Sequence, residues 1–266
     1  MSKPDNVGPY TLLSPLSDSA RARAWLARIA EGPEHVLKWA NDTDATGRAR
    51  LQHEMDIVAG LDHPNVVRML ERGDTRGMLW MALPKVGDGQ APLELAHFRQ
   101  LVLALVHLHA HGVVHADIKP ANLLLDDTGN LQVIGFGNAR RIGAGPLPPG
   151  GMPQYMSPEQ LRGEALDVRA DVFSAGAVLY HILTGKRPFD GTASEVTEGT
   201  VETGLLPPSA LVDGFGTGFD ELTGKMLAAD RSARHDSAFA VLAEFDAVCD
   251  HIAGSALIAC TATAPP

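Results

Sequence analysis

The spacing of apolar residues changes character along the chain near residue 83. Before that point, short apolar runs such as residues 24–27 and 35–40 alternate with turn-forming residues, a pattern typical of short β-strands. From residue 93 onward, apolar residues recur every three or four positions, which indicates helices with one buried face. The sequence therefore predicts an α+β protein in which strands come first and helices follow.

Three helices stand out from this pattern. The first is expected over residues 46–61, inside the strand-rich region, because apolar residues recur there at helical steps. The second is strongly apolar and is marked by Phe98, Leu101, Val102, Leu105, Val106 and Leu108. The third is expected over residues 172–184, since Gly185 and Pro188 follow as stop signals.

Composition and charge exclude several classes of protein. A chain of 266 residues with 45% hydrophobic content can bury a large core, and its two cysteines, Cys249 and Cys260, lack metal-type spacing, as expected in a reducing cytosol. The net charge of -10 argues against binding to nucleic acid or anionic lipid, so protein partners are expected. No apolar run is long enough to span a membrane, which predicts a cytoplasmic protein.

Three short segments resemble the signature motifs of protein kinases. Residues 115–122 read HADIKPAN, residues 133–137 read VIGFG and residues 157–159 read SPE. They are similar to the catalytic loop H-R-D-x-K-x-x-N, the metal loop D-F-G and the anchoring motif A-P-E of that family. The resemblance, closest to bacterial serine/threonine kinases, implies a bilobal fold with an antiparallel sheet and one helix in the first lobe and mainly helices in the second.

The resemblance divides the chain into four parts. We expect an N-terminal arm over residues 1–9, a first lobe over 10–83, a second lobe over 84–250 and a tail over 251–266. Between residues 83 and 115 the chain is shorter than in most kinases. The first small helix of the second lobe is therefore expected to be missing or reduced to a turn around residues 87–89.

The catalytic-loop resemblance assigns three roles. Asp117 stands where a kinase has the acceptor of the substrate proton, Lys119 where it has a cation for the transferring phosphoryl group, and Asn122 where it has a metal ligand. Gly135 replaces the aspartate that grips magnesium. For Asp117 a structural alternative stays open, that of a buried loop acid capping backbone amides. The resemblance thus implies vestigial or weak catalysis and weak or no magnesium binding.

The nucleotide side of the first lobe is also altered. Ser17, Ser19 and Ala22 stand where kinases carry three glycines, whose small size lets the backbone approach phosphates. Lys38 matches the phosphate-orienting lysine and Glu54 its ion-pair partner, although the same pair can serve only to hold the helix on the sheet. The remaining positions implied to contact a nucleotide are Ala24, Val36 and Leu124. ATP binding is permitted by this set, with Val36 narrowing the adenine slot.

Activation by phosphorylation is not expected. Ala116 replaces the arginine that would receive an activating phosphate, and residues 138–156 contain no serine or threonine. Met152 replaces a threonine that contacts the catalytic pair in serine/threonine kinases.

Residues that hold the kinase fold together are kept. The resemblance implies a buried ion pair between Glu159 and Arg234 and a supporting role for Asp171 beneath the catalytic loop. His115 and Phe136 are expected to stack in the core beside Val58. The histidines at 107, 109 and 111 are interpreted as surface residues rather than metal ligands.

Two functional hypotheses follow. In the first, the chain is a pseudokinase that binds a protein, such as a true kinase or a signalling complex, as a regulatory scaffold. In the second, it is a slow or atypical serine/threonine kinase that uses ATP through Lys38, Asp117, Lys119 and Asn122 with reduced dependence on magnesium.

Overall fold

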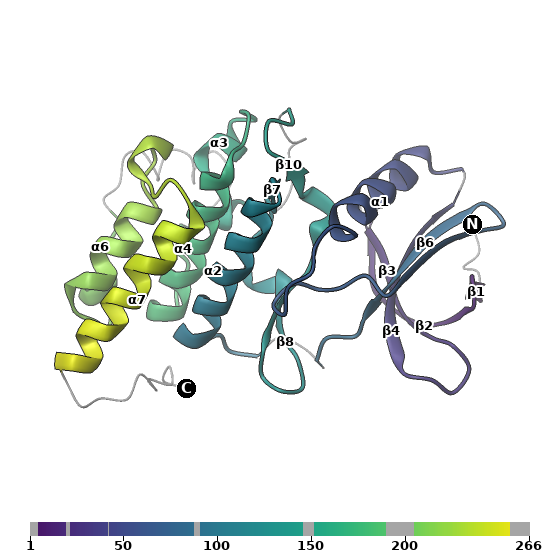
Figure 1. Ribbon diagram of the computed structural model, residues 1–266, viewed down its shortest axis with the longest axis horizontal. Helices are drawn as coiled ribbons and strands as arrows, with labels where there is room; N and C mark the ends of the chain where they lie inside the picture. The colour runs from purple at the N-terminus through teal and green to yellow at the C-terminus, as the bar shows by residue number, and fades with distance from the viewer. Residues whose placement is uncertain are drawn as a thin grey trace.

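The computed structural model describes residues 5–19, 22–41, 43–87, 91–145, 152–189 and 205–255. A sheet with one helix lies at one end of the molecule and a bundle of helices at the other (Figure 1). The expected α+β, two-lobed fold is therefore confirmed. Residues 1–4 of the predicted arm, 256–266 of the predicted tail and 146–151 lie outside the described residues, as does Cys260.

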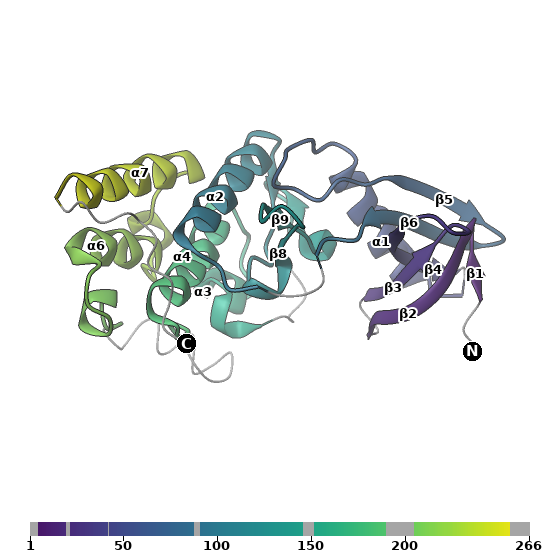
Figure 2. The ribbon, with the colours of Figure 1, turned by 90° about the horizontal axis from the view of Figure 1, so that it is seen from below.

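The first lobe is built on a six-stranded sheet in the order β1-β2-β3-β4-β6-β5, with every neighbouring pair antiparallel. Its strands are β1 Asn6–Val7, β2 Tyr10–Ser19, β3 Ala22–Arg28, β4 Glu34–Asn41, β5 Glu71–Thr75 and β6 Met78–Pro84. Figure 2 shows the strands from below, with β5 and β6 running beside α1. The alternation of short apolar runs and turn residues thus correctly predicted the strands of this sheet.

Helix α1, Ala45–Val58, packs on one face of this sheet. The Asp44 side chain caps its start by accepting a hydrogen bond of 2.8 Å from the Gly47 N–H. The expected end at Leu61 is wrong by three residues. The chain leaves the helix after Val58 and turns at Gly60, yet Leu61 stays in the apolar periodicity because it is buried in the loop that follows.

In the described part of the second lobe, the long helices are α2 Leu95–Ala110, α4 Val168–Thr184, α6 Gly216–Met226 and α7 Ala238–Ser255. The short helix α3, Pro158–Leu161, and the 3-10 turns η1 Pro120–Asn122, η2 Phe136–Asn138, η3 Pro153–Tyr155, η4 Pro208–Ala210 and η5 Arg231–Ala233 connect them. Helix α4 begins before the expected residue 172, because the Asp167 side chain caps the backbone N–H of Arg169. It ends at Gly185, as expected, where φ is +66°.

Two small strand pairs lie between the lobes and carry the loops with kinase-like motifs. They are β7 Val113–Val114 with β10 Arg140–Arg141, and β8 Leu123–Leu125 with β9 Leu131–Val133. The described residues between β6 and α2, 85–87 and 91–94, contain no helix, as expected, while 88–90 lie outside the described residues. Within the described part of the chain, no helix is both long and apolar enough to cross a membrane.

Candidate functional site

The loop of residues 115–122 connects β7 to β8 and is held from below by helix α4. Both carboxylate oxygens of the fully buried Asp171 accept backbone hydrogen bonds, from the His115 N–H and the Ala116 N–H, each at 2.8 Å. Hydrogen bonds to a carboxylate are stronger than those between neutral groups. The supporting role expected for Asp171 is therefore observed.

Ala116 adopts a backbone conformation that is rare for residues other than glycine. Its φ is +58°, its side chain is buried, and its carbonyl accepts a hydrogen bond of 2.9 Å from Gln160 Nε2. Such a conformation costs about 1–3 kcal/mol and persists only where its surroundings enforce it. The hydrogen bonds from the Ala116 N–H to Asp171 and from Gln160 to the Ala116 carbonyl hold the backbone in this conformation.

Asp117, Lys119 and Asn122 come together as the sequence predicted. Lys119 Nζ lies 2.8 and 2.9 Å from the two carboxylate oxygens of Asp117. Asn122 Nδ2 donates to one of these oxygens at 2.9 Å and to the Asp117 carbonyl at 2.7 Å. The Asp117 carboxylate is thus bound by side chains of its own loop rather than by the backbone amides of the structural alternative.

The space in front of Gly135 is taken by Asn122. Gly135 has a φ of +83°, and a Cβ built on it would lie 2.6 Å from Asn122 Oδ1. Magnesium prefers oxygen ligands in octahedral geometry and is held in kinases by an aspartate and an asparagine. Among the described residues, no group of three or more His, Cys, Asp or Glu side chains is placed to hold a metal. Residue 135 therefore offers no side-chain ligand at the position where a kinase has its magnesium-binding aspartate.

In the first lobe, the expected ion pair between β4 and α1 is present. Lys38 Nζ lies 2.5 Å from Glu54 Oε1, and both side chains are largely buried. Ala24 on β3 pairs with Lys38 in the strand register. A lysine held in this way can either meet a phosphate or simply tie the helix to the sheet, so both alternatives remain.

The β2–β3 hairpin takes the place of a glycine-rich loop. Ser17 pairs with Ala24 and Ser19 with Ala22 in this hairpin, and residues 20 and 21 lie outside the described residues. The side chains of Ser19 and Ala22 lie outside them too. Of the other positions implied to contact a nucleotide, Ala24 is buried at the end of its strand pair, while Ser17, Val36 and Leu124 are half-buried.

Comparison with known proteins agrees with this geometry. The family model described as protein kinase domain matches residues 28–243. The chain belongs to the protein kinase family. The serine/threonine-protein kinase PknJ of Mycobacterium tuberculosis is 33% identical over 255 residues, which cover 86% of this chain and 43% of the relative.

Two further relatives show the same relationship. The probable serine/threonine-protein kinase PknB of Bifidobacterium longum is 33% identical over 218 residues, covering 71% of this chain and 32% of the relative. The DNA damage-responsive serine/threonine-protein kinase RqkA of Deinococcus radiodurans is 34% identical over 212 residues, with coverage of 71% and 32%. This kinase-family chain therefore spans less than half the length of these relatives.

The packing between the lobes of this kinase-family chain follows expectation. The rings of His115 and Phe136 meet edge to face, with centroids 4.7 Å apart, and Phe136 belongs to the same core as Val58. His115 Nε2 donates to the Ile134 carbonyl at 3.0 Å, and its Nδ1 accepts the Asp117 N–H at 3.2 Å. Complete burial lowers the pKa of His115, so the ring is held neutral.

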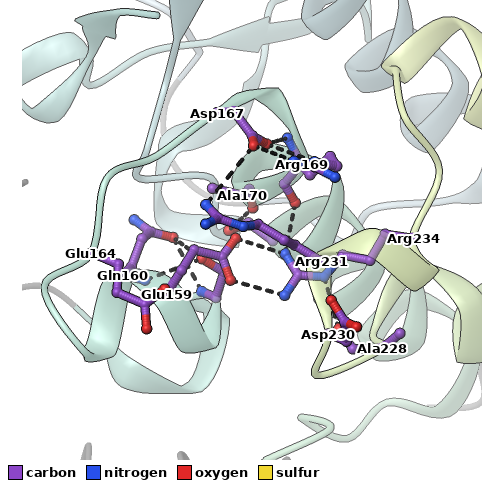
Figure 3. A network of polar contacts seen from close by, with 12 residues as sticks. Glu159, Gln160, Glu164, Asp167, Arg169, Ala170, Ala228, Asp230, Arg231 and Arg234 are labelled. Atoms are coloured by element: carbon purple, nitrogen blue, oxygen red, sulfur yellow. Dashed lines mark hydrogen bonds and ion pairs between the residues drawn. The ribbon is translucent and has the colours of Figure 1, made fainter. Parts of the chain in front are cut away.

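The predicted Glu159–Arg234 pair is confirmed as a bidentate ion pair between α3 and the residue that follows η5 (Figure 3). Arg234 Nη1 and Nη2 lie 2.7 and 2.9 Å from the two Glu159 oxygens, and the guanidinium also donates to the carbonyls of Ala228, Ala229 and Arg169. A cavity of about 330 Å³ opens beside the pair and is lined by Glu159, Arg162, Glu164, Ala229, Asp230 and Arg231. This cavity was not predictable from the sequence, because its walls come from segments far apart in the chain.

One interpretation from the sequence is wrong. His109 is not a surface residue, since its side chain is 9% exposed and its Nε2 lies 3.0 Å from Asp171 Oδ2. It therefore shares the carboxylate that holds the catalytic loop. The available signal was its position four residues after Leu105, on the apolar face of α2.

Proposed function

We propose that this chain is a pseudokinase that acts in the cytoplasm as a protein-binding or allosteric scaffold, with weak or no ATP binding. Its partner is a protein, such as a true kinase or a signalling complex, and not nucleic acid or a membrane. The observation that carries the proposal is residue 135 itself, a glycine without a ligand atom, whose Cβ position would lie 2.6 Å from Asn122 Oδ1. Asp117, the remaining acid of the loop, is engaged by Lys119.

The stabilisation that a bound metal normally supplies is large enough for its loss to impair catalysis. A bound metal supplies several kcal/mol of stabilisation to the developing charge in phosphoryl transfer. Losing about 4 kcal/mol of this slows the reaction roughly a thousandfold. Rates in that range suit a domain that works by binding rather than by turnover.

The pattern of what is retained points the same way. The Glu159–Arg234 pair and the support of the catalytic loop by Asp171 are complete, and both maintain shape. The phosphate-receiving arginine is absent at Ala116, and residues 138–156 carry no hydroxyl acceptor of the serine or threonine type. A protein that works as a scaffold is expected to keep the contacts that maintain the kinase fold and to lose the residues that regulate catalysis by phosphorylation.

Transfer of labelled phosphate from ATP to a generic protein acceptor tests the proposal. We predict that the wild type and Asp117→Asn give the same background signal with magnesium, with manganese and with a chelator. Transfer by the wild type that disappears in Asp117→Asn would refute the pseudokinase assignment. The variant keeps the side-chain volume, so folding of both proteins is checked first by circular dichroism.

A second candidate is a slow or atypical serine/threonine kinase that uses ATP with reduced dependence on magnesium. The assembled pairs favour it, since Lys38 meets Glu54 and Lys119 meets Asp117 at short distances. Two lysines could then neutralise phosphate charge in part without a divalent ion. Its signature in the same assay is transfer that needs Asp117 and persists in the chelator.

A further inference from the structure

Three histidine rings meet where the first lobe joins the second. His63 lies in the loop after α1, and His107 and His111 lie at the end of α2. The ring centroids of His63 and His107 are 5.2 Å apart, and those of His107 and His111 are 4.2 Å apart. The spacing of the helical histidines does not indicate that His63 packs against them.

Hydrogen bonding shows which charge state two of these rings must have. The backbone N–H of Asp62 donates to His107 Nε2 at 3.3 Å, and the backbone N–H of Asn65 donates to His63 Nδ1 at 3.1 Å. A backbone N–H can only donate, so each of these ring nitrogens must offer a lone pair. Both nitrogens of a protonated imidazole are donors. Protonation of His63 or His107 therefore breaks the hydrogen bond that its ring accepts.

His111 behaves differently. Its Nδ1 donates to the His107 carbonyl at 2.8 Å, and a donor nitrogen is present in both charge states of the ring. Arg141 Nη1 donates to the His111 carbonyl at 2.8 Å, which adds a positive charge near the end of α2. Protonation of His111 would thus leave its own bond intact and place a second charge beside His107.

The surroundings favour the neutral rings at neutral pH. Burial, followed by repulsion from His107, lowers the pKa of His63. Burial and repulsion from His111 lower the pKa of His107, while the nearby Asp62 carboxylate opposes them.

The stacked rings hold one end of the segment that links α1 to β5. The other end is fixed by groups that do not titrate: Asn65 Nδ2 donates to Gln100 Oε1 and to the Leu131 carbonyl, and the Val67 N–H donates to the Val133 carbonyl. This segment starts directly after α1, the helix that carries Glu54. The histidines are therefore the groups that titrate where the segment between α1 and β5 contacts α2.

We propose that His63 and His107 form a pH-sensitive clamp that holds residues 62 and 63 on α2 while the rings are neutral, through the Asp62 N–H bond to His107 and the packing of His63 on His107. In acid, protonation removes both accepted hydrogen bonds and places like charges in contact. The start of the segment then separates from α2, while the end anchored by Asn65 and Val67 stays bound. Helix α1 gains freedom to move relative to the second lobe.

Amide hydrogen exchange at Asp62 and Asn65 tests the clamp, measured at about pH 7.5 and pH 5.5 and corrected for the intrinsic exchange rate. We expect protection of both amides to fall by up to about tenfold per pH unit in the range where the rings charge. In the double variant His63→Asn with His107→Gln, the side-chain oxygens can accept the same bonds but do not titrate, so the fall should vanish. His251→Gln, a change at an exposed histidine of α7, should behave as the wild type does.

Two results would overturn the clamp. One is protection at Asp62 and Asn65 that stays constant between the two pH values in the wild type. The other is the same loss in the double variant as in the wild type. If the double variant does not fold, His63→Asn alone gives the answer at the Asn65 amide. The outcome does not depend on phosphate transfer, so the clamp and the pseudokinase assignment can fail separately.

Discussion

Asn122 fills the space in which a side chain on residue 135 would begin: its Oδ1 lies 2.6 Å from the position of a Cβ on Gly135. Its Nδ2 is held by the Asp117 carbonyl and carboxylate. The backbone at residue 135 is left-handed, a conformation that aspartate tolerates better than most residues. The barrier to a restored aspartate is thus the neighbouring amide more than the backbone.

Gly135→Asp is therefore expected to destabilise the protein rather than rebuild a metal site. We predict a loss of about 1–3 kcal/mol in the free energy of unfolding, from the left-handed backbone and the contact with Asn122. Adding Asn122→Ala should recover part of the loss. Gly163→Asp isolates the backbone contribution, because Gly163 has a φ of +67° and open space around its Cβ position. Equal losses at the two glycines in urea unfolding would show that the contact is unimportant.

The buried ion pair between Glu159 and Arg234 should contribute strongly to stability. Glu159→Ala leaves the Arg234 guanidinium buried without its carboxylate, and we predict a loss of about 3–5 kcal/mol. The matched control is Asp246→Ala, which removes the bidentate but exposed partner of Arg99 and should cost less than about 1 kcal/mol. If Glu159→Ala and Asp246→Ala lower the free energy of unfolding by similar amounts in denaturant, burial does not set the strength of the two pairs.

Lys38 and Glu54 should behave as a structural pair. Lys38→Met leaves Glu54, which is 6% exposed, without its cation, and we expect a loss of about 3–5 kcal/mol. The double change Lys38→Met with Glu54→Leu should be milder, since no unpaired charge remains. A double-mutant cycle of unfolding free energies measures the coupling. Additive losses would mean that the two side chains do not support each other.

Acid should weaken the fold through histidines that are neutral when folded. Burial lowers the pKa of five of them below the ordinary value of 6.5: His63, His107, His115, His181 and His235. A depressed pKa means that the unfolded chain binds protons first as pH falls. Stability is therefore full above pH 6.5 and is lost as pH drops below it, by up to about 1.4 kcal/mol per pH unit for each ring. Unfolding free energies between about pH 7.5 and pH 5.5 that stay level would contradict this.

Motifs with fixed spacing allowed much of the site to be predicted from the sequence. The pairs Lys38–Glu54 and Glu159–Arg234 and the position of Asp171 were all expected, and each is present. These contacts depend on the family fold, which the periodicity of apolar residues and the loop motifs identify together.

Contacts made by residues outside those motifs were not predictable. His109 reaches Asp171, and His63 stacks on His107, because the chain folds back over long distances in sequence. Periodicity reports burial but not the partner, so it also extended α1 to the buried Leu61, beyond the observed end at Val58. Specific packing between distant segments is information that a single sequence does not display.

Thermal unfolding with millimolar ATP, with and without magnesium, tests most directly the claim that this kinase-family chain lacks a working metal site. We predict that magnesium adds no stabilisation in the presence of ATP, whether or not ATP alone shifts the midpoint. A ligand at a hundred times its dissociation constant stabilises by about 2.7 kcal/mol, which such a scan resolves. A magnesium-dependent gain of that size, lost in Asn122→Ala, would contradict the claim.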